Sequence, residues 1–172
     1  MITITIYLYT GEGAGKTTNA LGAALRSIGH GHKVVIIQFM KWWKKTGEKK
    51  IEDKLKPEYE IHQFGKEGRK SLGDLEEKDR KLAEEGLEYA KKAVKEKEPD
   101  LLVLDEINLA VHCDLLNVNE VIQFLGEIPE EMDVFLTGRY APEELIETAD
   151  SVTKILDVKN PNEMITKKGI QY

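Results

Sequence analysis

The sequence predicts an α/β domain with three layers, in which a mostly parallel sheet is flanked by helices on both faces. Short apolar, β-branched segments alternate with helix-prone segments along the chain. The apolar segments are nearly continuous, which is typical of strands that are covered on both faces. A glycine-rich loop joins the first of them to a helix-prone segment. The chain of 172 residues (1–172) fits a single domain of ordinary size.

Each expected element has a local signature. Strands are expected over residues 2–9, 34–39, 58–64, 101–104, 133–136 and 151–156. The first is rich in β-branched residues, and the second reads VVIIQF, which is typical of a buried strand. Helices are expected over residues 16–28, 75–97, 118–125 and 142–148. The first helix is rich in Ala and Leu and ends at a glycine stop, whereas the second is long and charged.

A Lys- and Trp-rich segment, residues 41–56, interrupts this alternation. It reads KWWKKTGEKKIEDKLK, with seven Lys, three acidic residues and the adjacent Trp42 and Trp43. We expect a loop at the C-terminal edge of the second strand. It is either a solvated surface loop or a mobile lid, and a flat apolar ligand would explain exposed tryptophans there.

Composition excludes several classes of protein. The net charge of −6 argues against a general nucleic-acid binder, whose surface is basic. No apolar run approaches the ~20 residues of a membrane span. The single cysteine, Cys113, excludes an internal disulfide and a cysteine-based zinc cage. The N-terminal segment has no basic region of the kind found in signal peptides, so we expect a cytoplasmic protein.

The strongest functional signal is a phosphate cradle between the first strand and the first helix. Its candidate residues are Gly11, Glu12, Gly13, Ala14, Gly15, Lys16, Thr17 and Thr18. Glycines allow backbone N–H groups to converge on phosphate oxygens, and the helix N-terminus adds partial positive charge. Lys16 supplies a full positive charge, and the hydroxyl of Thr17 can bind Mg²⁺ or Mn²⁺. The general P-loop pattern has glycine where this chain has Thr10.

A second signal is the apolar segment LLVL, which is followed by Asp105 and Glu106. A carboxylate at the C-terminal end of a strand lies near the cradle and offers the hard oxygen ligands that Mg²⁺ prefers. If the strand continues, the two side chains point to opposite faces, so one of them reaches the metal directly. Without the cradle, this pair would read as a solvated strand end.

Two arginines are further candidates for contact with nucleotide. Arg139 follows the strand over 133–136, where it can clamp phosphate or pair with Glu143 or Glu144 on the surface. Arg26 lies near the end of the first helix, where a polar surface role is the simpler interpretation. No catalytic triad and no metal-ligand spacing of histidines is evident, so we expect catalysis by positioning and charge neutralisation of a polyphosphate.

Several motifs together resemble the P-loop ATP:corrinoid adenosyltransferases of the cob(I)yrinic acid a,c-diamide type. They are GEGAGKTTNALGAALRSIGHGHKVVIIQFMK, LLVLDEINLAVHCDLL, FLTGRYAPEELIETADSVTKI and the terminal GIQY. That family also carries Thr at the position of Thr10. The resemblance spans the chain from Tyr9 to the C-terminus and is weakest over residues 44–97.

The resemblance implies a RecA-like fold and transfer of the 5′-deoxyadenosyl group of ATP to the cobalt of a reduced corrinoid, with release of triphosphate. The corrinoid would be cob(I)alamin, cobinamide or cob(I)yrinic acid a,c-diamide. It assigns the triphosphate to Gly11–Thr18, with Lys16 and Thr17 central, and nucleotide contacts to Arg26 and Arg139. Glu106 matches the acid that lies close to nucleotide and metal, and Asp105 is a second candidate. A reduced flavoprotein as electron donor and a homodimer are implied as well.

This chain departs from the family at two places. Glu12 and Ala14 stand where the family often has Asn and Lys, and Gly68-Arg69-Lys70-Ser71 replaces an aromatic stretch that handles the corrinoid. We therefore expect Trp42, Trp43 or Phe64 to take the aromatic role. The competing functions are a P-loop kinase or NTPase acting at the γ-phosphate, and a non-catalytic nucleotide-binding module.

Overall fold

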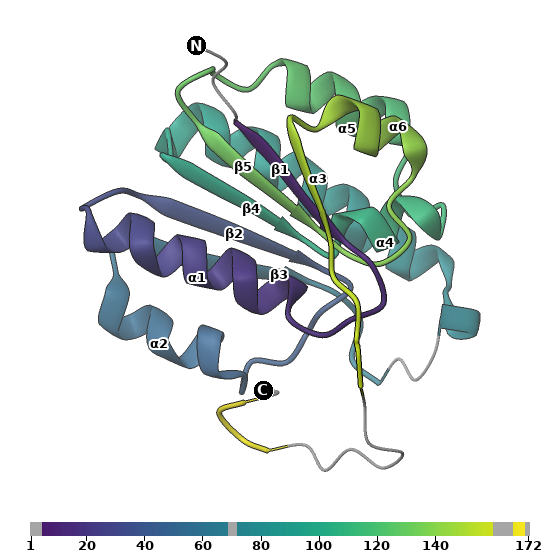
Figure 1. Cartoon of the computed structure of the whole chain (residues 1–172), viewed down its shortest axis with the longest axis horizontal. Coiled ribbons are helices and arrows are strands. Elements are labelled where there is room, and N and C mark those ends of the chain that lie inside the picture. The colour runs from purple at the N-terminus through teal and green to yellow at the C-terminus, as the bar shows by residue number, and fades with distance from the viewer. Residues whose placement is uncertain (1–4, 69–71, 160–166, 171–172) are drawn as a thin grey trace.

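The computed structural model describes residues 5–68, 72–159 and 167–170 (Figure 1). Its strands are β1 (Ile6–Thr10), β2 (Val34–Phe39), β3 (Tyr59–Phe64), β4 (Leu101–Asp105), β5 (Asp133–Thr137) and β6 (Ser151–Lys154). They form one six-stranded sheet in the order β3-β2-β4-β5-β1-β6, and every neighbouring pair is parallel. The predicted parallel sheet is confirmed. Residues 2–4 of the first expected strand lie outside the described residues.

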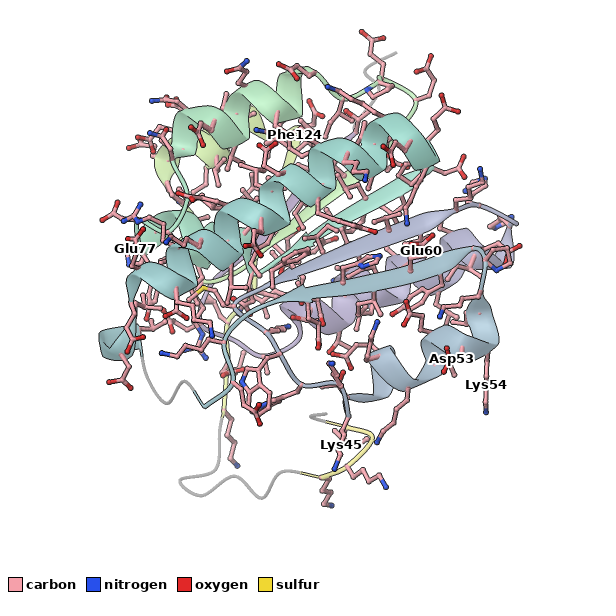
Figure 2. The ribbon with its side chains drawn as sticks, turned by 180° about the vertical axis from the view of Figure 1, so that it is seen from behind. Lys45, Asp53, Lys54, Glu60, Glu77 and Phe124 are labelled. Atoms are coloured by element: carbon pink, nitrogen blue, oxygen red, sulfur yellow. The ribbon has the colours of Figure 1, made fainter. Side chains whose placement is uncertain are left out.

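Helices cover both faces of this sheet. They are α1 (Lys16–Gly29), α2 (Gly47–Leu55), α3 (Glu77–Lys97), α4 (Ile107–His112), α5 (Val118–Gly126) and α6 (Glu143–Thr148), with a short 3-10 helix η1 (Leu72–Asp74). Helices α1 and α2 lie on one face, and α3 runs across the other, as the view from behind shows (Figure 2). Val35 and Ile37 pack in the core on the α3 side, and Val34 and Ile36 pack in the core on the α1 side. This alternation explains why the strands read as continuous apolar runs.

The prediction of a loop over residues 41–56 is wrong for residues 47–55, which form α2. The side chain of Glu52 is buried and accepts hydrogen bonds from the Ile61 backbone N–H at 3.1 Å and from Lys49 at 2.6 Å. Polar contacts therefore dock this Lys-rich helix on the edge strand β3. Asp53 and Lys54 project outward from α2 (Figure 2). No helix among the described residues is long and apolar enough to cross a membrane.

The sheet brings several polar strand ends to one edge. Because all the strands are parallel, the C-terminal ends of β1, β2, β4 and β5 lie together. Tyr9 of β1 pairs with Thr137 of β5, and Gln38 of β2 pairs with Asp105 of β4. Ligands of open α/β sheets bind outside this edge.

Candidate active site

The glycine-rich loop joins β1 to α1 and lies against the segment that follows β6. Gly11 has a positive φ of 97°, and a Cβ atom there would lie 2.3 Å from the carbonyl oxygen of Ile155, so only glycine fits. The backbone N–H of Gly13 donates to the same oxygen at 3.0 Å. The backbone N–H of Ala14 donates to Oδ1 of Asp157 at 3.1 Å. An anionic oxygen thus already accepts from one amide of the cradle, which is the role that a phosphate oxygen would take.

Lys16 is the first residue of α1, and its side chain turns back into the loop. Its ammonium donates to the carbonyl oxygens of Gly11 at 2.7 Å and Gly13 at 2.6 Å. The residue is only 7% exposed, and burial lowers the pKa of Lys16 below its ordinary value. A poorly solvated cation interacts strongly with an incoming anion, because little water competes for it.

Asp105 accepts hydrogen bonds from four side chains. Its Oδ1 accepts from Thr17 at 2.8 Å and from Thr137 at 2.6 Å. Its Oδ2 accepts from Gln38 at 2.9 Å and from Lys41 at 2.6 Å. The carboxylate is 1% exposed, so these donors replace water around the charge. Asp105 therefore links the cradle to the ends of β2, β4 and β5.

Lys41 and Asp105 form an ion pair in which the carboxylate is buried and the lysine is partly exposed. Burial opposes both charges, but the surrounding charges and hydrogen bonds, those of the partner foremost, outweigh it. The pKa of Lys41 therefore lies above its ordinary value, and the pKa of Asp105 lies below its ordinary value. Sequence reasoning missed Lys41 and Thr137 as site residues, because their role depends on how the strands are arranged. The sequence signal that could have identified them is their position: Lys41 follows the buried strand β2, and Thr137 ends the strand β5.

Glu106 lies beside this cluster in an unusual backbone conformation. Strand β4 ends at Asp105, and Glu106 has a positive φ of 65° as the N-cap of α4, so the expected alternation of faces does not extend to it. Its backbone N–H donates to Oγ1 of Thr137 at 3.0 Å. Burial and the nearby charge of Asp105 raise the pKa of Glu106, although Lys41, Lys16 and Arg139 oppose the shift.

We expect Glu106→Gln to stabilise the nucleotide-free protein at pH 8. Folding raises the pKa of this carboxyl group, so its ionisation destabilises the folded protein once the pH exceeds the unfolded-state pKa near 4.5. The stability gained by Glu106→Gln should therefore vanish below about pH 4, where the carboxyl group is protonated in both states. The rise in melting temperature should be about 2–4 °C, measured by thermal unfolding at both pH values. Glu84→Gln, on an exposed position of α3, is the control. Equal stability of Glu106→Gln and the parent protein at pH 8 would contradict the placement of Glu106.

The structure brings Arg139, but not Arg26, to the cradle. Nη1 of Arg139 lies 3.5 Å from Oε2 of Glu12, so this arginine pairs with the glycine-rich loop and not with the surface acids that follow it. Arg26 is ten residues after Lys16 on α1, a rise of about 15 Å along the helix. It lines a separate cavity of about 280 Å³ with Asn19, Tyr9 and others. Arg26 therefore lies too far from the glycine-rich loop of the same chain to contact a triphosphate bound there.

A cavity of about 340 Å³ opens at the C-terminal edge of the sheet, next to the cradle. It is lined by Phe39, Met40, Lys41, Leu72, Glu106, Leu109, Arg139 and Tyr140. Its walls combine charged groups with apolar and aromatic side chains, as in many small-molecule sites. The cavity places an apolar surface within reach of the charged cluster.

The expected aromatic residues have different positions. Trp42 and Trp43 follow Lys41 and contact each other edge to face, with ring centroids 6.0 Å apart, and Trp43 is 57% exposed. Phe64 instead packs toward α3, with its ring centroid 5.8 Å from that of Tyr89. Phe64 does not line the 340 Å³ cavity, whereas its strand partner Phe39 does. Residues 69–71 of the divergent stretch lie outside the described residues.

Comparison with known proteins gives consistent results. The family model described as ATP:corrinoid adenosyltransferase BtuR/CobO/CobP matches residues 3–172. The corrinoid adenosyltransferase of Escherichia coli K12 is 33% identical over 97% of this chain and 85% of its own length. That of Sinorhizobium sp. is 36% identical over 97% of this chain and 79% of its own length. A solved KaiC-like protein of Pyrococcus horikoshii has a TM-score of 0.55 at 20% identity, covering 92% of this chain and 75% of its own, and shows the fold alone.

Proposed function

The chain belongs to the ATP:corrinoid adenosyltransferase family, and from this premise we propose that it transfers the 5′-deoxyadenosyl group of ATP to the cobalt of a reduced corrinoid. The observation that supports this most directly is the glycine-rich loop beside the Asp105 cluster. It places Lys16, Thr17 and the backbone N–H of Ala14 at the edge of the sheet where a nucleotide would bind. These are groups that hold a polyphosphate.

The cobalt(I) centre attacks C5′ of the ribose, a Co–C bond forms and the C5′–O bond breaks with its electron pair on the departing triphosphate. The triphosphate leaves intact, so the protein must orient ATP and offset the charge on the leaving oxygen. The Lys16 ammonium and the backbone N–H of Ala14, which now donates to Asp157, would face the triphosphate there. Arg139, at the cavity and next to Glu12, adds a further positive charge. No covalent enzyme intermediate is needed.

Thr17 and Asp105 fit Mg²⁺ or Mn²⁺. Their oxygens lie 2.8 Å apart and are hard ligands, and Glu106 adds a second carboxylate nearby. Across the described residues, no group of three or more His, Cys, Asp or Glu side chains forms a metal cage. Such a set suits an ion that also takes its ligands from phosphate oxygens. Bound there, the ion would offset negative charge on the triphosphate.

The decisive test is incubation with ATP, Mg²⁺ and chemically reduced cobalamin. We expect the corrinoid spectrum to change to that of an alkylated cobalt and one equivalent of intact triphosphate to appear. Release of ADP, with the corrinoid unchanged, would instead indicate a kinase or NTPase. Nucleotide binding without any turnover would indicate a binding module.

We place the corrinoid over the mouth of the 340 Å³ cavity, next to Trp42 and Trp43. Exposed apolar side chains surround this mouth, including those of Leu72 and Tyr140. Flat aromatic rings suit the large apolar face of a corrin. The reduced flavoprotein donor, the homodimer and the cytoplasmic location stay predictions.

The double variant Trp42→Ala/Trp43→Ala should raise the KM for corrinoid by about tenfold while ATP binding stays unchanged. These are the two tryptophans of the chain, so corrinoid binding should also quench the intrinsic fluorescence of the parent protein. Leu25→Ala, on α1 and 62% exposed, is the control for loss of an exposed apolar side chain. Normal corrinoid affinity and turnover in the double variant would exclude this surface.

A further inference from the structure

The ammonium group of Lys41 lies between the two residues proposed as metal ligands. Its Nζ is 3.0 Å from Oγ1 of Thr17 and 2.6 Å from Oδ2 of Asp105. Both are oxygens that a divalent ion would bind at this site. The position where a metal would neutralise Asp105 is thus held by a cation of the chain itself.

The backbone fixes Lys41 in this position. Met40 has a positive φ of 60°, which turns the chain at the end of β2, and its N–H donates to the carbonyl oxygen of Phe64 at 2.8 Å. Gly65 packs so closely here that a Cβ atom on it would lie 2.5 Å from the backbone nitrogen of Lys41. A left-handed non-glycine residue costs free energy and persists only where its surroundings hold it. The turn therefore aims the Lys41 side chain into the site.

The Lys41 side chain also has room to leave. It is 28% exposed, against 1% for Asp105, and it lines the 340 Å³ cavity that lies beside the cradle. The side chain can turn into that cavity, because it already lines it. The carboxylate stays in place, because Thr137 and Gln38 donate to its two oxygens.

A divalent ion and the Lys41 ammonium cannot share this position. Like charges a few ångströms apart repel strongly where water is scarce. A bound nucleotide reduces this repulsion, because its phosphates add several negative charges that can bind both the metal ion and the displaced ammonium. Free metal alone offers no such compensation.

We propose that Lys41 is a built-in counter-cation that occupies the metal position until nucleotide arrives, so that Mg²⁺ binds only together with ATP. Lys41 then moves from Asp105 toward the triphosphate. It acts as a positioning residue for the metal, and it keeps free divalent ions out of the empty site. This inference rests on the metal site of the proposed function.

Mn²⁺, followed by electron paramagnetic resonance, tests the proposal without any turnover. In the absence of nucleotide, Lys41→Met should bind Mn²⁺ about tenfold or more tightly than the parent protein. Lys44→Met, which removes an exposed lysine of the same segment, should behave like the parent. Equal Mn²⁺ affinity of Lys41→Met and the parent protein would overturn the proposal, as would tight Mn²⁺ binding by the nucleotide-free parent.

Two further measurements keep the test decisive. Lys41→Gln retains a donor for Asp105 without the charge, and Mn²⁺ alone should raise the melting temperature of this variant but not that of the parent protein.

Thr17→Ala separates this inference from the proposed function. If Mn²⁺ binding with ATP depends on Thr17 but Lys41→Met gains no affinity for free Mn²⁺, the inference fails and the metal site survives. If Mn²⁺ binding with ATP ignores Thr17, the metal site itself is wrong.

Discussion

Lys16→Ala should lower ATP-dependent adenosylation by about 10²–10³-fold, the usual loss when one preorganised donor to a developing anion is removed. The ammonium of Lys16 lies inside the cradle on the carbonyl oxygens of Gly11 and Gly13, so it needs only a small movement to reach a phosphate. Triphosphate release with excess ATP and reduced cobalamin measures the loss. A fall in kcat at saturating ATP would show that the charge acts on the leaving group as well as on binding.

The fold should survive this substitution. Burial lowers the pKa of Lys16, so removal of the side chain relieves a desolvated charge while it costs two hydrogen bonds. Thermal unfolding should therefore place Lys16→Ala close to the parent protein. Lys44→Ala is the matched control, because it removes an exposed lysine near the site and should leave turnover unchanged. Full activity of Lys16→Ala would exclude the cradle as the triphosphate site.

The fold followed from the sequence where local signals were strong. The run at Val34–Phe39 is buried along its whole length, and its apolar residues could be recognised without the structure. Helix α2 was missed because part of its anchoring is a tertiary contact: the backbone N–H of Ile61, on strand β3, donates to Glu52. A Lys-rich segment with one buried acid does not show the apolar periodicity by which helices are predicted.

The site was predictable only in part, for the same reason. Glycine spacing and a strand ending in Asp-Glu are local patterns, and they correctly put Thr17 and Asp105 at the same sheet edge. The ion pair with Lys41 depends on β2 and β4 being neighbours, which the sequence order does not state. Arg26 is the reverse case. Its position in a motif made it a candidate for nucleotide contact, but it lies near the end of α1, far from the glycine-rich loop.

Asp105→Asn should cost about 2–3 kcal/mol of unfolding free energy at pH 7, because four donors lose a buried carboxylate acceptor and Lys41 loses its charged partner. All four hydrogen bonds of Asp105 are accepted by its carboxylate. In Asp105→Asn an NH₂ group replaces one of these acceptor oxygens, so two donors would face each other. Urea unfolding measures the loss. Asp53→Asn removes an exposed ion pair with Lys56 and should change stability by less than about 1 kcal/mol.

The pH dependence identifies the cause of this loss. The pKa of Asp105 is lowered by folding, so its stabilising effect is present above the unfolded-state value near 3.8 and disappears as pH falls through the folded-state value. The stability gap between the parent protein and Asp105→Asn should therefore be widest near neutrality and close in acid. Lys41→Met/Asp105→Asn should recover part of the loss, because neither charge of the pair remains without its partner. A gap that is small at pH 7, or one that persists unchanged in acid, would mean that the ion pair does not hold the ends of β2 and β4 together.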